Sequence, residues 1–159
     1  MQIYLLRHGI AEAGKPGAPD SERVLVPEGR KKLREVLKAA RSAGVSPSLI
    51  VSSPYKRAVE TAEIAAIALG YQAEIAQSAA LVPDSMPHKV WAEIRTLQDQ
   101  ESILLAGHEP LFGLLFAYLL DAPSLLVDFK KGGLARIDIE TFASQPRGVL
   151  RWFIIPKIA

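Results

Sequence analysis

Short apolar runs alternate with amphipathic helical patterns along the chain, and this alternation constrains the fold more than any other feature of the sequence. Strands are expected at Gln2–Arg7, Leu49–Ser52, Ala73–Ala76, Ser102–Gly107, Leu134–Glu140 and Leu150–Ile155. Helices are expected at Pro27–Ser42, Pro54–Leu69, His88–Gln100 and Pro110–Leu120. Strands that alternate with helices predict a layered α/β fold with a mostly parallel sheet, and the two closely spaced final strands predict an antiparallel pair.

The length of 159 residues fits one domain, and no repeat, low-complexity tract or linker divides the chain. We therefore expect a single domain over residues 1–159. The chain contains no cysteine, which excludes a disulfide scaffold, a thiolate nucleophile and a thiolate zinc site. Any imidazole chemistry must come from one of three histidines: His8, His88 or His108.

Charge and hydropathy argue against two classes of partner. The formal net charge is only +2, without the concentrated basic stripe of a nucleic-acid binder. The longest uncharged apolar stretch, Pro110–Leu120, is well short of the ~20 residues that cross a bilayer. Arg7 interrupts the apolar start of the chain, so we expect no signal peptide. The sequence predicts a cytoplasmic protein that binds neither nucleic acid nor membranes.

Histidine and arginine residues follow the strands where ligands usually bind α/β folds, beyond the carboxyl ends of the strands. The first strand leads into Arg7, His8 and Gly9, and the third long strand leads into His108. Arg57 falls in the first turn of the helix that follows the second strand. If these strands are neighbours, two histidines and two arginines converge on one edge of the sheet. That combination predicts a phosphate site.

Each of these residue types has a defined use at a phosphate site. The neutral imidazole of His8 can attack phosphorus and form a phosphohistidine. Arginine presents a planar set of donors that matches phosphate oxygens. Ser53 is the expected N-cap and Pro54 the expected first residue of the second helix, so Arg57 and the helix dipole would face the same anion. Gly9 would let a ligand approach the backbone closely.

Three short motifs carry a resemblance to a known family, the histidine phosphatase superfamily. They are Leu5-Leu6-Arg7-His8-Gly9, Ser52-Ser53-Pro54 with Arg57, and Gly107-His108-Glu109-Pro110. The resemblance implies a three-layer α/β/α sandwich with a mostly parallel central sheet, as in phosphoglycerate mutases. It also implies that His8 is the phosphorylated nucleophile and that Arg7, Arg57 and His108 form the phosphate pocket.

Further stretches resemble the SixA-type phosphohistidine phosphatases: Asp20-Ser21-Glu22-Arg23, Leu81-Val82-Pro83 and Lys131-Gly132-Gly133-Leu134-Ala135. Val26 departs from that pattern, which usually has threonine there. Because valine cannot cap a helix through its side chain, Pro27 is the expected start signal. The resemblance implies hydrolysis of phosphohistidine on a protein, for instance a histidine phosphotransfer domain, by a monomer or weak oligomer.

The general acid is the least defined part of the expected site, with Asp84 and Glu12 as the candidates. A phosphoramidate can leave as an imidazole protonated on its own nitrogen, whereas an alkoxide needs a donor. The lack of an obvious acid therefore favours a P–N substrate. The alternatives are a phosphatase of small phosphomonoesters and an inactive phosphate-binding module. No cofactor or metal is expected, because metal motifs are lacking and arginines around His8 would repel a cation. His88 is expected to be a surface residue.

Overall fold

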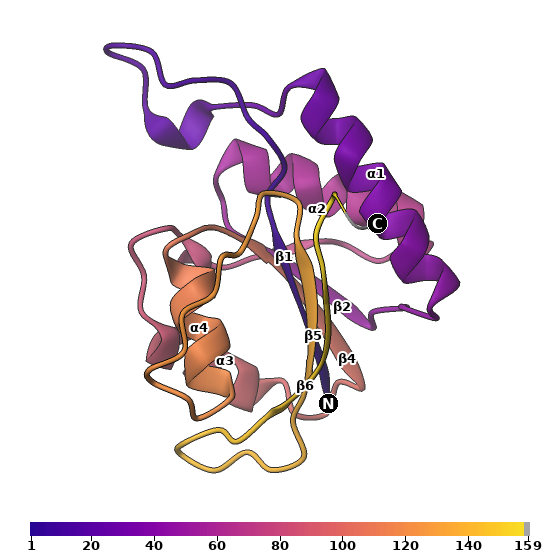
Figure 1. Ribbon diagram of the computed structural model, residues 1–159, viewed down its shortest axis with the longest axis vertical. Helices are drawn as coiled ribbons and strands as arrows, with labels where there is room; N and C mark the ends of the chain where they lie inside the picture. Colours follow the sequence, from indigo (N-terminus) through magenta and orange to yellow (C-terminus); the bar gives the residue numbers. More distant parts are fainter. Residues whose placement is uncertain (158–159) are drawn as a thin grey trace.

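The computed structural model describes residues 1–157 and shows an α/β fold (Figure 1). Its strands are β1 (Gln2–Arg7), β2 (Leu49–Ser52), β3 (Ala76–Gln77), β4 (Ser102–Gly107), β5 (Leu134–Asp138) and β6 (Val149–Ile154). Its helices are α1 (Pro27–Ser42), α2 (Lys56–Leu69), α3 (Pro87–Thr96) and α4 (Leu111–Leu119). Two short 3-10 helices, η1 (Asp20–Glu22) and η2 (Ala79–Leu81), lie in the connections.

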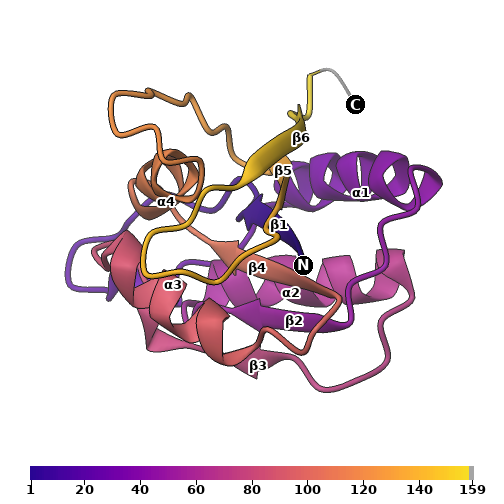
Figure 2. The same ribbon diagram turned by 90° about the horizontal axis from the view of Figure 1, so that it is seen from below.

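The six strands form one sheet in the order β3-β2-β4-β1-β5-β6. Strands β3, β2, β4 and β1 pair in parallel, whereas β5 is antiparallel to both β1 and β6. This confirms the mostly parallel sheet and the antiparallel pair at the end of the chain. Helices α1 and α2 cover one face and α3 and α4 cover the other, so the fold is the expected three-layer sandwich (Figure 2).

The continuous apolar run of β1 follows from burial on both faces of the sheet. Ile3 and Leu5 pack into the cluster under α3 and α4, while Tyr4 and Leu6 pack into the cluster under α1 and α2. All four are almost completely buried. Successive strand residues point to opposite faces, so a strand between two helical layers needs apolar residues at every position.

Helix α1 has the boundaries that the sequence predicts. Val26 stands at the N-cap without a side-chain hydrogen bond, and Pro27 occupies the first turn, as expected. Leu33, Leu37 and Ala40 are completely buried on the apolar face of the helix. Because proline lacks an N–H, it removes one of the donors that a capping side chain would otherwise have to satisfy.

The expected start of α2 is wrong by two residues. The helix begins at Lys56 with Tyr55 at the N-cap, so Ser53 is not the cap and Pro54 is not the first helical residue. The backbone N–H of Ser53 instead donates to the Ala106 carbonyl at 2.9 Å, which keeps Ser53 in register with the sheet. Pairing with β4 therefore extends to the residue that local sequence predicts as the N-cap of the helix.

Other boundaries shift by a few residues where tertiary pairing ends. Helix α3 starts at Pro87, one residue before the expected His88, and ends at Thr96, four residues before the expected Gln100. Helix α4 lacks the expected terminal residues Pro110 and Leu120. The weak strand expected at Ala73–Ala76 pairs only through Ala76 and Gln77. Strand β5 stops at Asp138 because β1, its partner, starts at Gln2, and β6 runs one residue earlier than expected, from Val149 to Ile154. The length of a strand at the edge of the sheet depends on the strand that it pairs with, so the sequence of one segment does not determine it.

No helix among the described residues is long and apolar enough to cross a membrane.

Candidate active site

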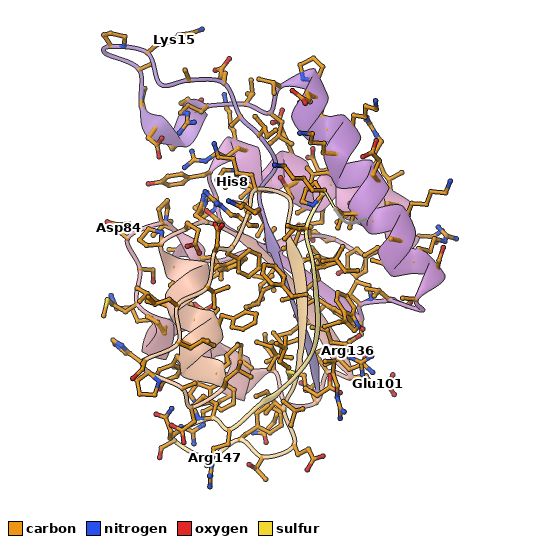
Figure 3. The ribbon with its side chains drawn as sticks, viewed as in Figure 1. His8, Lys15, Asp84, Glu101, Arg136 and Arg147 are labelled. Atoms are coloured by element: carbon orange, nitrogen blue, oxygen red, sulfur yellow. The ribbon has the colours of Figure 1, made fainter. Side chains whose placement is uncertain are left out.

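The sheet register places the three predicted motifs side by side at the carboxyl edge. Arg7 pairs with Gly107 across β1 and β4, and the backbone N–H of His8 donates to the Gly107 carbonyl at 2.9 Å. Ser53 follows β2 on the other side of β4. Figure 3 shows His8 at this end of the sheet, with Glu101 and Arg136 at the opposite end. Parallel pairing thus brings together residues that are far apart in sequence.

His8 is buried, and its two ring nitrogens have different partners. Nδ1 lies 2.7 Å from the carbonyl oxygen of Gly9, and Nε2 lies 3.3 Å from Nε of Arg57. The carbonyl can only accept and the guanidinium can only donate, so Nδ1 carries the proton and Nε2 holds the lone pair. The contacts therefore fix the tautomer that leaves Nε2 available as a nucleophile.

Burial, together with surrounding positive charge, keeps both site histidines neutral. Burial is the main cause that lowers the pKa of His8 to about 3, and Arg57, Arg7 and Lys131 lower it further. The pKa of His108 is also lowered to about 3, by burial first and then by His8 and Arg57. At neutral pH the site therefore presents unprotonated imidazoles among guanidinium groups, which is the state that attack on phosphorus requires.

Arg57 is buried in the first turn of α2 and is fixed by Asp20 of η1. Nη1 donates to the Asp20 backbone carbonyl at 2.8 Å, and Nη2 donates to its carboxylate at 3.0 Å. Hydrogen bonds from Arg23, and then from Arg57, hold the pKa of the Asp20 carboxyl below its usual range. Asp20 therefore stays ionised and orients the guanidinium so that its Nε–H points at His8.

His108 lies beside His8, with 5.1 Å between the ring centroids. Its Nε2 is 2.8 Å from Oγ of Ser53, and the ring of Tyr55 packs edge-on against it at 5.1 Å. Ser53 Oγ already accepts from the Tyr55 backbone N–H, so its own proton is available to Nε2. When Ser53 Oγ donates to Nε2, the ring proton of His108 is on Nδ1, which is buried without a hydrogen-bond partner in residues 1–157.

Arg7 ends β1 and is held by the loop that precedes β5. Its Nη1 donates to the carbonyl of Phe129 at 2.6 Å, whereas its buried Nε forms no hydrogen bond with the described part of the chain. Arg7 Nε and His108 Nδ1 are thus two buried nitrogens without a hydrogen-bond partner in the described part of the chain. An unpaired buried donor costs ~1–3 kcal/mol, a cost that an anionic ligand between them would remove.

The structure gives Gly9 a packing role. A Cβ at this position would meet Leu33 of α1 at 2.7 Å, so the absent side chain makes room for the helix. The backbone N–H of Gly9 donates to Oγ1 of Thr61 at 3.2 Å, and its carbonyl accepts from His8. Binding of substrate by Gly9 stays a prediction, while its observed contacts orient the imidazole.

Neither candidate general acid contacts the site histidines. Asp84 is exposed in the loop before α3, to one side of His8 in Figure 3, and lines a separate surface pocket. Glu12 forms hydrogen bonds through its backbone: its N–H donates to the Val24 carbonyl, and its carbonyl accepts from Nε of Arg23. His88 is exposed on α3, as expected, and lines an apolar groove away from the site.

The site also uses residues that the sequence reasoning did not assign to it. Asp20, Ser53 and Thr61 position Arg57, His108 and Gly9 respectively. Asp20 and Ser53 stand within stretches that carry the family resemblance, which was the available signal. Glu109 is a further case, since burial raises the pKa of its carboxyl and Arg7 is close enough to lower it.

Among residues 1–157 there is no group of three or more histidine, aspartate or glutamate side chains that could hold a metal ion.

Comparisons with known proteins show the family of this chain. The model of the histidine phosphatase superfamily (branch 1) matches residues 3–81, which include His8 and Arg57. An uncharacterized protein of Picosynechococcus sp. is 32% identical over 114 residues, which are 71% of this chain and 69% of that protein.

Two solved structures have the same fold over nearly the whole chain. The protein histidine phosphatase SixA complexed with tungstate superposes with a TM-score of 0.89 at 26% identity, over 99% of this chain and 98% of that one. A putative alpha-ribazole-5'-phosphate phosphatase from Escherichia coli has a TM-score of 0.74 at 20% identity, over 100% and 99% of the two chains.

The fold and the paired histidines with their arginines define a phosphatase of the phosphoglycerate mutase-like fold. The chain belongs to the histidine phosphatase superfamily, in its SixA-type branch.

Proposed function

We propose that this chain hydrolyses phosphohistidine carried by a protein, through a covalent phospho-His8 intermediate. The observation that carries the proposal is the lone pair on Nε2 of a buried, neutral His8, with Nε of Arg57 only 3.3 Å away. The likeness to the histidine phosphatase SixA supports the substrate class.

The first step transfers the phosphoryl group to His8. Nε2 attacks phosphorus, the N–P bond to His8 forms, and the P–N bond of the substrate breaks. The substrate imidazole leaves with a proton from solvent on its nitrogen. Arg57, Arg7 and Nδ1 of His108 surround the position of the phosphoryl oxygens and stabilise their charge during transfer.

The second step returns the enzyme to its starting state. Water attacks the phosphorus of phospho-His8, the bond to Nε2 breaks, and inorganic phosphate leaves. The proton on Nδ1 of His8 stays on that nitrogen throughout and is donated in a hydrogen bond to the Gly9 carbonyl, since Nδ1 takes no part in bond formation. The neutral imidazole is thereby regenerated without a cofactor.

The surroundings of His8 favour a P–N substrate over a phosphate ester. No carboxylate of the described residues hydrogen-bonds to either site histidine, and Asp20, which reaches the site through Arg57, is held ionised. An ionised carboxylate with a lowered pKa cannot donate a proton to an alkoxide. An imidazole leaving group does not need such a donor.

Glu109 supports a second candidate, hydrolysis of small phosphomonoesters. Glu109 directly follows His108 in the chain, and burial raises the pKa of its carboxyl, which favours the protonated form, although Oε1 accepts from the Gly113 N–H. The fold likeness to a putative alpha-ribazole-5'-phosphate phosphatase agrees with this alternative. Glu109→Gln separates the two, because only ester hydrolysis should depend on that acid.

The decisive experiment compares a phosphorylated histidine phosphotransfer protein with p-nitrophenyl phosphate and sugar phosphates. We expect the largest kcat/KM for the phosphoprotein, trapped acid-labile phosphate on the wild type, and neither turnover nor trapped phosphate with His8→Ala. Turnover by His8→Ala at the wild-type rate contradicts the mechanism. A higher kcat/KM on esters, lost in Glu109→Gln, contradicts the substrate assignment.

A further inference from the structure

A cavity of about 440 Å³ adjoins the active site and shares Arg7 with it. The charged residues that line it are Arg7, Lys32, Lys130, Lys131, Lys157 and Asp128. They come from the end of β1, from α1, from the loop before β5 and from the segment after β6, which lies beside α1 in Figure 1. Five cations and one carboxylate around one hollow predict an anionic occupant.

Backbone hydrogen bonds fix the loop before β5 against the nucleophile strand. The N–H of Gly132 lies 3.1 Å from the carbonyl of Arg7 and 3.0 Å from that of His8, and Arg7 in turn donates to the Phe129 carbonyl. Gly132 has a φ of +74°, which favours glycine there. The neighbouring Lys131 is therefore held close to His8, and its charge helps to lower the pKa of that imidazole.

The positive charge of the cavity is only partly compensated within the chain. Lys130 pairs with Asp128 at 2.6 Å, and Lys32 pairs with the largely exposed Glu28 at 3.2 Å. Arg7 and Lys131 form no salt bridge within residues 1–157. The cavity therefore keeps a net positive charge beside the position of the phosphoryl group.

We propose that this cavity binds acidic side chains that flank the phosphohistidine of a protein substrate; the proposal rests on the function proposed above. Since Arg7 lines both the cavity and the phosphate site, a bound carboxylate lies next to the phosphoryl group. A volume of this size suits a few side chains and lies within the ~300–1,000 Å³ range of ligand sites. Lys130 and Lys131 are exposed, so a group presented from a protein surface reaches them.

The test uses two phosphohistidine peptides that differ only in their flanking residues, Asp and Glu in one and Asn and Gln in the other. We expect wild-type kcat/KM to favour the acidic peptide by on the order of tenfold at low salt, with the preference falling as salt rises. The variant K32Q/K157Q should reduce that ratio to about threefold or less. Both lysines lie outside the hydrogen-bond network of the site histidines.

The control variant R34Q/K38Q removes equal charge from α1, at residues that line a different groove between α1 and α2. It should keep the full preference for the acidic peptide. Equal hydrolysis of both peptides by the wild type overturns the proposal, as does an equal loss of preference in R34Q/K38Q.

A third arm separates protein from small-molecule sources of the anion. Phosphomonoesters with and without a second carboxylate are compared in the same variants. The wild type could prefer the esters with the second carboxylate, lose that preference in K32Q/K157Q, and show no preference between the peptides. That result assigns the cavity to small molecules and overturns the proposal. Failure to hydrolyse either peptide, with esters still hydrolysed, overturns the proposed function and this inference with it.

Discussion

Nε of Arg57 donates to Nε2 of His8 across 3.3 Å, so the proposed nucleophile is aligned by a cation that would also bind the transferring group. The contact requires a neutral His8, because a protonated Nε2 could not accept. It also requires Asp20, which occupies the other two guanidinium nitrogens. His8 directly follows β1, Arg57 belongs to α2 and Asp20 to η1, so the arrangement depends on tertiary structure.

Replacing Arg57 should reduce phosphohistidine hydrolysis strongly. We expect Arg57→Ala to lower kcat/KM by ~10²–10³-fold, the cost of removing one preorganised donor to a charged transition state. Arg57→Lys should restore little, because an ammonium cannot contact both Asp20 and His8. Steady-state kinetics with a phosphoprotein checks this, with thermal unfolding as the control for folding. Full activity of Arg57→Lys would show that charge alone suffices.

Stability should fall as pH is lowered from about 6.5 toward 3. Both site histidines have folded pKa values of about 3, below the ordinary 6.5, so the unfolded chain binds their protons first. The free energy of unfolding should therefore drop by up to ~1.4 kcal/mol per pH unit for each histidine in this window.

Denaturant unfolding at pH 7, 6 and 5 measures this dependence above the range where Asp20 and Asp138, whose pKa values are lowered, begin to titrate. His108→Asn should show about half the slope of the wild type. An unchanged slope in that variant contradicts the assignment.

Removing the charge of Asp20 should strengthen binding of tetrahedral oxoanions. Asp20→Asn keeps a side-chain oxygen for Arg57 but removes a negative charge that competes with the ligand. We expect tungstate to bind several-fold more tightly at low salt, measured by calorimetry or by inhibition, with the gain reduced as salt rises. Glu22→Gln is the matched control, since Glu22 belongs to the same short helix and pairs with Lys56. Equal gains in both variants would indicate a general charge effect.

Ser53 should act on catalysis through His108. Ser53→Ala leaves Nε2 of a buried imidazole without its partner, which costs ~1–3 kcal/mol of stability. The imidazole is then free to take the other tautomer, so Nδ1 loses its fixed proton and kcat should fall about tenfold. Ser53→Thr, which retains a hydroxyl, should recover most of kcat. If Ser53→Ala loses stability but keeps kcat and its pH profile, the residue is structural only.

Gly29 should be the exception to the rule that alanine stabilises a helix relative to glycine. A Cβ at this position in α1 would lie 2.2 Å from the carbonyl oxygen of Ile10, just after the nucleophile segment. Gly29→Ala should therefore destabilise the protein by ~1–3 kcal/mol, where helix propensity alone predicts a gain of ~1 kcal/mol. Thermal unfolding of Gly29→Ala shows whether the change in stability is a loss or a gain. Lys31→Ala, at an exposed position on the same helix, is the control.

Much of the fold could be predicted from local pattern because its main elements are locally encoded. Strands β1, β2 and β4 and helix α1 have the predicted boundaries, since their apolar periods match complete burial on one or both faces. The boundaries that shifted lie at the sheet edge or at helix ends, where pairing with another segment decides. The start of α2 is the clearest case, because the backbone N–H of Ser53 still donates to Ala106 of β4.

Local sequence was enough to predict the alternation of strands and helices and the residue types beyond the strand ends, where His8, Arg57 and His108 stand. The other features of the site depend on contacts between distant segments. Only the folded chain shows that Gly9 and Arg57 set the His8 tautomer, that Asp20 holds Arg57, and that lysines from separate segments surround one cavity. Local sequence fixes short-range periodicity, whereas hydrogen bonds and pKa shifts depend on distances between residues far apart in the chain.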